Sequence, residues 1–123
     1  YLQSLDVSRN LKDQSGEAAA LGNLGVICYE TGDLEQAEKY YEKQLDIVRT
    51  IGDLQGESNA CGNLGNVFAD QEQFQAAISF YERALQISRM VGNPYSLAND
   101  LSNLGSIYAD IGQTERAINF SFR

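Results

Sequence analysis

Apolar residues recur along this chain with the spacing of amphipathic helices. Between residues 53 and 92, Cys61, Leu64 and Phe68 follow one another at intervals of three and four, which places them on one helical face. After Gln71 to Gln73 a second such pattern begins. Its inner face is expected to carry Phe74, Ala77, Tyr81, Leu85 and Val91. No segment alternates as a half-buried strand does, so we expect an all-α protein.

Turn and capping residues separate these helices. Asp53 stands where an N-cap is needed, and Gly92-Asn93 closes the second helix. Pro94 follows in a first-turn position, where its missing N–H does no harm. Thr31-Gly32-Asp33 is an equivalent stop-and-cap signal earlier in the chain. The pattern therefore predicts helical hairpins.

The hairpin pattern returns about every 40 residues, as in stacked helical arrays. Gly22-Asn23-Leu24-Gly25 recurs as Gly62-Asn63-Leu64-Gly65 and as Ser102-Asn103-Leu104-Gly105. We divide the chain into the end of a preceding repeat (1–13), repeat 1 (14–53), repeat 2 (54–93) and an incomplete repeat 3 (94–123). Such arrays offer an extended concave surface, so binding is the first functional hypothesis.

Glycines inside the first helix of each repeat call for a structural reason. Each of Gly62 and Gly65 costs about 0.8–1 kcal/mol relative to alanine in a helix interior. We expect the missing Cβ to let the two helices of a hairpin approach closely. Ala37, Ala77 and Ala117 are the expected other half of that contact.

These residues resemble the tetratricopeptide repeat (TPR), whose pattern sets a large residue, Leu-Gly, aromatics and alanines at fixed offsets. The matching residues are Leu21, Leu24, Gly25, Cys28, Ala37, Tyr41 and Gln44 in copy one, Cys61, Leu64, Gly65, Phe68, Ala77, Tyr81 and Ala84 in copy two, and Leu101, Leu104, Gly105, Tyr108 and Ala117 in copy three. Ser121 departs from the aromatic. The repeat length is similar to a subclass that includes Pins/LGN-type adaptors, kinesin light chains and bacterial signalling arrays. The resemblance implies a right-handed superhelical solenoid of antiparallel helix pairs, with first helices lining the inner curve.

A polar stripe runs along each first helix, opposite the apolar one. We predict that the stripes form the peptide-binding surface, through Asn23, Val26, Tyr29 and Glu30, through Asn59, Asn63, Asn66 and Asp70, and through Asn99, Asn103, Ser106 and Asp110. Aligned asparagines can hold an extended peptide, because each amide both donates and accepts hydrogen bonds. The alternative is that asparagine is simply tolerated on a wet face or bridges neighbouring repeats.

Glu30, Asp70 and Asp110 form a carboxylate column along the same helices. These carboxylates either select a partner with lysine or arginine near this edge of the surface, or they are simply solvated residues at helix ends. The stripes contain no lysine or arginine. This disfavours the clamp by which some TPR domains hold a partner's C-terminal carboxylate. Lys39, Lys43 and Arg83 are expected on solvated helix surface. The arginines in the last turns of the second helices, Arg9, Arg49 and Arg89, are each expected to stabilise a helix C-terminus.

Composition narrows the partner. The 123 residues carry a net charge of −8, which argues against nucleic acid and against an anionic membrane. There is no histidine and there are two cysteines, Cys28 and Cys61, which we expect to be small buried hydrophobes. No nucleophile–base pair, phosphate loop or metal-ligand spacing is present, so we expect no enzyme activity and no cofactor. A cytoplasmic location is the expectation.

The ends of the chain suggest an alternative function. Residues 1–11 match the later part of a second helix and residues 114–123 match its start. We therefore expect a larger parent protein or head-to-tail self-association. The alternative to a peptide-binding scaffold is a structural or self-associating solenoid segment of a larger signalling protein without a groove ligand.

Overall fold

The computed structural model is an array of antiparallel helices. It describes the backbone of residues 2–121 and the side chains of residues 12–112. The helices are α1 (Leu2–Glu30), α2 (Leu34–Ile51), α3 (Leu54–Asp70), α4 (Phe74–Val91) and α5 (Pro94–Ser121), and residues 2–121 contain no strand. The expectations for Arg9, Ala117, Ser121 and the pairing of the two chain ends lie outside the residues whose side chains are described.

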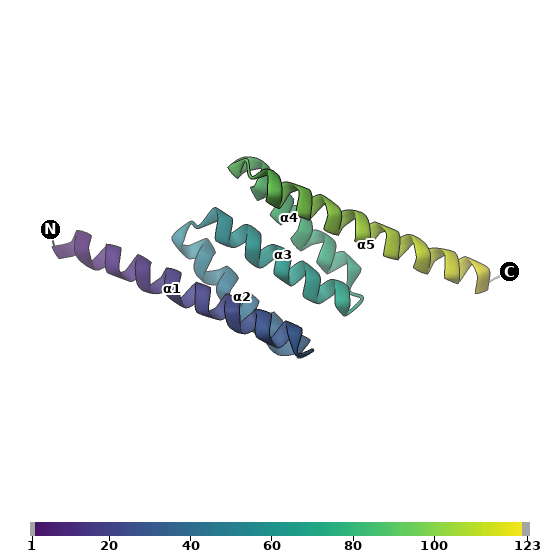
Figure 1. Ribbon diagram of the computed structural model, residues 1–123, viewed down its shortest axis with the longest axis horizontal. Coiled ribbons are helices and arrows are strands. Elements are labelled where there is room, and N and C mark those ends of the chain that lie inside the picture. Colours follow the sequence, from purple (N-terminus) through teal and green to yellow (C-terminus); the bar gives the residue numbers. More distant parts are fainter. Residues whose placement is uncertain (1, 122–123) are drawn as a thin grey trace.

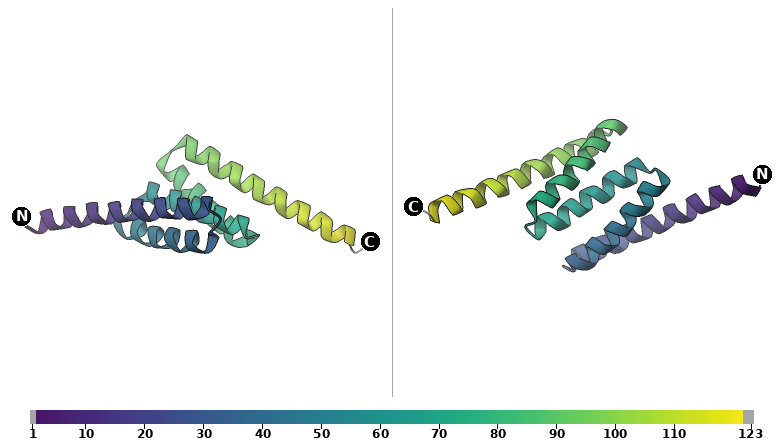
Figure 2. Two further views of the ribbon diagram at one scale, coloured as in Figure 1. Left: turned by 60° about the horizontal axis from the view of Figure 1, so that its bottom comes forward. Right: turned by 180° about the vertical axis from the view of Figure 1, so that it is seen from behind.

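Each helix packs against its neighbours in sequence. α1 packs against α2, α3 packs against both α2 and α4, and α5 packs against α4. Figures 1 and 2 show α1, α3 and α5 in one layer and α2 and α4 in the other, with the termini at opposite ends. The structure is a helical repeat solenoid, which confirms the prediction of an all-α repeat fold.

The predicted turns are present. The Asp53 carboxylate accepts a hydrogen bond of 2.9 Å from the Gly56 N–H and caps α3. The Asp33 carboxylate caps α2 in the same way, through the Gln36 N–H at 3.2 Å. Gly52, with φ 75°, ends α2 in the left-handed region, which glycine enters without steric cost. Sequence therefore located these helix ends correctly.

Two helix boundaries that the repeat pattern implies are absent. Helix α1 runs through residues 12–13 and α5 runs through residues 111–113, which align with turns of the other copies. Lys12 occupies the position of Gly52, and a side chain with a Cβ resists the left-handed conformation that ends α2. Gly112 aligns with Gly32, but one glycine inside a helix costs only about 1 kcal/mol and does not force a turn. The division into repeats remains a prediction.

The core lies between the two layers. Leu64 of α3 and Ile87 of α4 are fully buried, and Tyr81 is 3% exposed. The apolar stripe of α5 is half open, since Leu101 and Tyr108 are 49% and 53% exposed. In the described part of the chain no second helix covers that face of α5.

Val91 does not belong to the core as expected. It is 45% exposed because it is the last residue of α4, where the chain turns away at Gly92. Ile87, one turn earlier, takes the buried position instead. Phe74 and Leu85 are partly buried and pack against the core as predicted.

A buried carboxylate joins three helices. Glu57 of α3 is 5% exposed, and its Oε2 accepts hydrogen bonds from Nε of Arg49 at 3.2 Å and Nε of Arg83 at 2.9 Å. Burial alone would raise the pKa of Glu57, but the two arginines outweigh it and lower the pKa below its usual value. The expectation that Arg83 is ordinary solvated surface is therefore wrong. Arg49 likewise pairs with a side chain of the next repeat, beyond any interaction with its own helix end.

We expect Glu57→Gln to lower the free energy of unfolding by about 1 kcal/mol at pH 7, because both ion pairs are lost. The figure is modest because the arginine side chains are 49% and 39% exposed. Since the folded-state pKa is lowered, this stabilisation is present above the unfolded pKa and disappears as pH falls through the folded one. Urea unfolding at several pH values measures it.

Glu35→Gln is the matched control. Its pair with Lys39 spans 3.8 Å between side chains that are 80% and 58% exposed, so its loss should change stability by under about 0.5 kcal/mol. Equal stability of the two variants at pH 7 would show that the Glu57 bridge contributes no more than a surface pair.

Candidate functional site

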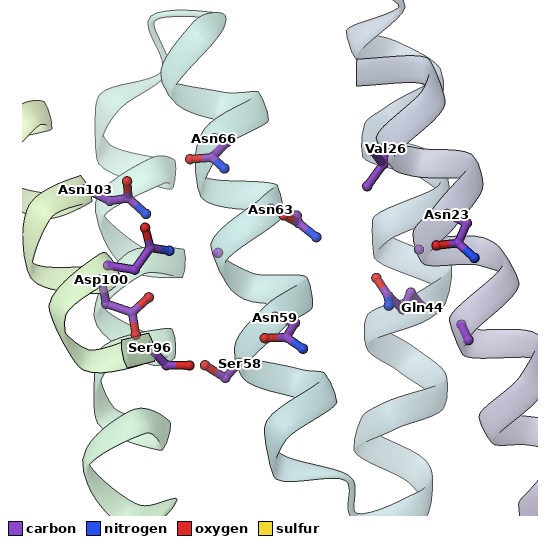
Figure 3. Close-up of a pocket in the computed structure, with 14 residues that line it drawn as sticks. Asn23, Val26, Gln44, Ser58, Asn59, Asn63, Asn66, Ser96, Asp100 and Asn103 are labelled. Carbon is purple, nitrogen blue, oxygen red and sulfur yellow. The ribbon is translucent and has the colours of Figure 1, made fainter. Parts of the chain in front are cut away.

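An open cavity of about 400 Å³ lies between the first helices of the three repeats. Its walls come from α1, α3 and α5, and Gln44 of α2 reaches it between α1 and α3 (Figure 3). Its described lining residues are Ala19, Gly22, Asn23, Val26, Gln44, Ser58, Asn59, Gly62, Asn63, Asn66, Ser96, Asn99, Asp100 and Asn103. The volume is within the range of pockets that hold small molecules, about 300–1,000 Å³.

The structure brings together some of the predicted surface and leaves the rest outside. Of the twelve predicted residues, those that line the cavity are Asn23, Val26, Asn59, Asn63, Asn66, Asn99 and Asn103. Those that do not are Tyr29, Glu30, Asp70, Ser106 and Asp110. The asparagine stripes thus converge on one place, whereas the carboxylate column lies beyond it.

Most of the asparagine amides in the cavity are free. Within the described part of the protein, Asn23, Asn63, Asn99 and Asn103 make no hydrogen bond. Two others are partly used: the Asn59 carbonyl accepts from Gln55, and the Asn66 carbonyl accepts from the Tyr81 hydroxyl. Burial raises the pKa of Tyr81 to about 12, so this phenol remains a donor at neutral pH. The free amides offer both donors and acceptors to a ligand.

Beyond the cavity, Tyr29 and Asp70 pair with each other across two repeats. The Tyr29 hydroxyl donates to Oδ2 of Asp70 at 2.5 Å. Partial burial and this hydrogen bond raise the pKa of Tyr29 above its ordinary value. The pair links α1 to α3 and uses one oxygen of Asp70. Glu30, Ser106 and Asp110 are exposed.

The helix glycines serve two different purposes. A Cβ on Gly65 would lie 2.5 Å from the Tyr81 ring, and one on Gly25 would lie 2.5 Å from the Tyr41 ring. The predicted close approach is therefore confirmed for Gly25 and Gly65, and the atoms nearest to the added Cβ belong to the tyrosine ring. For Gly62 the prediction is wrong, because a Cβ there would meet nothing within 4 Å. Gly62 lies in the cavity wall.

Sequence reasoning missed the polar residues at the base of the cavity. Gln44 stands where copy two has Ala84, and its Oε1 is buried without a hydrogen-bond partner in the described structure. Gly22 leaves room for it, since a Cβ there would lie 2.5 Å from the Gln44 amide nitrogen. Asp100 stands where copy two has Ala60. A polar residue at a position that is alanine in another copy was the available signal.

Asp100 ends a chain of buried hydroxyl groups. Ser88 Oγ donates to Asp100 Oδ2 at 2.7 Å, and Ser58 Oγ lies 3.3 Å from Ser88 Oγ. Because the Ser88 proton is directed at Asp100, Ser88 Oγ is the acceptor from Ser58, whose single proton is also within reach of the Ala84 carbonyl at 3.4 Å. All three residues are at most 4% exposed. Burial raises the pKa of Asp100, and the Ser88 hydrogen bond only partly opposes it.

The cysteines do not build a reactive or metal-binding site with their described neighbours. Cys61 is fully buried, and burial raises its pKa to about 11, so it is a thiol at neutral pH. Cys28 is partly buried against the same core. Residues with described side chains contain no cluster of ligands suited to a metal ion. No helix among them has the length and apolar character needed to cross a membrane.

Comparison with known proteins agrees with this architecture. The sequence model of the tetratricopeptide repeat family matches residues 1–50 and 57–121. The chain belongs to the tetratricopeptide repeat family. The structure is similar to the TPR domain of Arabidopsis FLU, with a TM-score of 0.77 and 19% sequence identity over 88% of this chain and 91% of that one. A search of curated proteins finds no match.

Membership defines the general role. TPR domains are interaction modules that bind protein partners, and the family is generally non-enzymatic. At 19% identity the similarity to the FLU domain extends to the fold alone. The partner has to be sought in the chemistry of the cavity.

Proposed function

We propose that this TPR array is a protein–protein interaction scaffold that holds an extended peptide segment in the cavity between α1, α3 and α5. The observation that supports it most is the convergence of four unpaired carboxamides, those of Asn23, Asn63, Asn99 and Asn103, on one open cavity. Main-chain N–H and C=O groups of an extended peptide need both kinds of partner, and each carboxamide supplies both.

These amides make no hydrogen bonds within the described protein, which also limits the free-energy cost of binding. An interaction surface that is already in place has few internal hydrogen bonds to break before it can receive a ligand. The helical frame further fixes the spacing between the Asn63 and Asn103 side chains, which come from adjacent first helices. Gly62 adds to the opening, because it lines the cavity and carries no side chain.

The Asn63→Ala and Asn103→Ala double variant tests this function. Peptides are first selected on the wild-type chain from a phage-displayed library of random 12-residue sequences, and their affinities are then measured by fluorescence polarisation. We expect the double variant to bind about tenfold more weakly, which corresponds to about 1.4 kcal/mol. Its thermal stability should stay near that of the wild type, because neither side chain has a partner in the described structure.

Gln75→Ala is the matched control, since it removes an exposed amide of α4 outside the cavity. It should leave affinity unchanged. Peptides that bind the double variant as tightly as the wild type would contradict the groove hypothesis.

The self-associating solenoid is the second candidate, and the exposed Leu101 and Tyr108 on α5 favour it. Apolar side chains that neighbour one another on an open helix face are a feature of interaction surfaces. Sedimentation across a concentration series separates the two candidates: a concentration-dependent mass supports self-association, and a constant monomer mass rejects it. The carboxylate column at Glu30, Asp70 and Asp110 stays a prediction for a basic partner near the rim.

A further inference from the structure

The base of the cavity contains two acceptor oxygens without hydrogen-bond partners in the described structure. Asp100 is 4% exposed, and one of its oxygens, Oδ2, accepts from Ser88. The other oxygen, Oδ1, has no hydrogen-bond partner in the described structure. Figure 3 shows the Asp100 side chain directed from α5 towards α3, over the cavity. A second unpaired acceptor in the same lining is Gln44 Oε1, which is buried.

No positive charge offsets Asp100 from within the cavity. Among the described lining residues there is no lysine or arginine, and Asp100 is the only one with an acidic or basic side chain. No ion pair involves Asp100 among residues 12–112. A buried carboxylate without a cation is costly, because charged groups lose hydration on burial. A cationic ligand group entering the cavity would offset that cost.

The hydroxyl chain strengthens the case for a cation. Ser88 donates to Asp100, and the single Ser58 proton is used towards Ser88 Oγ or the Ala84 carbonyl, so neither hydroxyl has a proton left for a ligand. Ser58 Oγ, which also lines the cavity, is thereby left with lone pairs for a ligand. Donor-rich groups are therefore favoured at this place, and acceptor groups such as a carboxylate are disfavoured.

We propose that Asp100 is the anchor of a subsite for one lysine side chain of the bound peptide, a proposal that rests on the proposed groove function. An ammonium is favoured over a guanidinium because only one carboxylate oxygen is open. Arginine gains most from a bidentate pair with both oxygens, whereas an ammonium acts as a compact point charge with three rotatable donors. Asp100 Oδ1 and Ser58 Oγ are the acceptors assigned to it.

The 12-residue phage library tests the subsite when it is selected separately on wild type, Asp100→Asn and Asp46→Asn. Asparagine is nearly isosteric with aspartate and keeps an oxygen that can accept from Ser88. Asp46→Asn makes the same charge change at an exposed position of α2 outside the cavity. We expect lysine at a fixed position in peptides selected on wild type and on Asp46→Asn, and its loss on Asp100→Asn.

Replacing that lysine by norleucine in the best peptide gives the quantitative readout. The substitution should weaken binding to the wild type and to Asp46→Asn at least tenfold, and to Asp100→Asn less than twofold. Replacement by arginine should weaken wild-type binding by a smaller factor.

The failure of this subsite and the failure of the groove are distinguishable. Peptides that depend on Asn63 and Asn103 but show no lysine preference, or keep it on Asp100→Asn, overturn the subsite and leave the groove intact. Selected peptides that carry arginine at the fixed position would support a cation-binding subsite but overturn its assignment to lysine. Selected peptides that ignore Asn63 and Asn103 altogether overturn both proposals.

Discussion

Replacing Gly65 by alanine is expected to lower the free energy of unfolding by about 1 kcal/mol, the overpacking cost less the gain in helix propensity. The new Cβ would lie 2.5–2.9 Å from three atoms of the Tyr81 ring, and overpacking of this kind costs about 1–3 kcal/mol. The ring cannot easily move aside, because Tyr81 is 3% exposed and its hydroxyl is bonded to Asn66. The loss should exceed the gain in helix propensity, which is about 1 kcal/mol. Urea unfolding followed by circular dichroism measures the difference.

Gly62→Ala is the internal control, because the two glycines lie three residues apart on the same helix. A Cβ on Gly62 meets no atom within 4 Å, so only the propensity gain remains and the variant should be more stable by up to about 1 kcal/mol. Opposite signs for the two variants would confirm that Gly65 is needed for the approach of α3 and α4. Stabilisation by both would show that the ring yields without cost.

The repeat pattern allowed the fold to be predicted because its signals are local. Asp33 and Asp53 cap helices through hydrogen bonds that span only three residues, and such bonds depend on neighbouring sequence alone. The stripe of Cys61 and Leu64 likewise follows from helical periodicity, and both residues are fully buried. The same local reasoning failed at residues 12–13 and 111–113. At the first site Lys12 replaces the glycine that ends α2, and at the second Gly112 is present but does not force the helix to end.

Contacts between repeats were harder to predict because they depend on distances that no spacing rule gives. Glu57 meets Arg49 and Arg83 from two other helices, and Tyr29 meets Asp70 across 41 positions of sequence. The asparagine stripes could be aligned from sequence, since aligned positions of stacked repeats face the same way. Gln44 was overlooked because it belongs to a second helix and reaches the cavity only through the space beside Gly22.

Asp100 was missed for a different reason. It is one residue outside the predicted polar stripe, at a position where copy two has the buried Ala60. A charge at a buried repeat position is a departure from the pattern, and the search for recurring residues passed over it. A residue that differs between repeat copies can indicate function, because the shared fold does not require the difference.

Asp100→Asn is expected to raise the free energy of unfolding by about 1 kcal/mol at pH 7, because the buried carboxylate lacks a cation and its replacement removes the cost of burying a charge. Ser88 can still donate to the amide oxygen, so the hydrogen-bonded chain to Ser58 is kept. A residue that weakens the fold while offering its charge to a cavity fits a binding role better than a structural one.

The pH dependence of this gain follows from the raised pKa of Asp100. The folded state holds the proton to a higher pH than the unfolded state, so stability falls as pH rises from the unfolded pKa, about 3.9, through the folded one. The variant lacks this fall. Its advantage should be small at pH 4, grow with pH and become constant above the folded pKa. Comparing the two proteins at each pH cancels the opposite contribution of Glu57, which both retain. Equal stability of the two proteins at pH 7 would mean that the Asp100 carboxylate is adequately solvated through the cavity. A cationic ligand group would then gain little free energy by pairing with it.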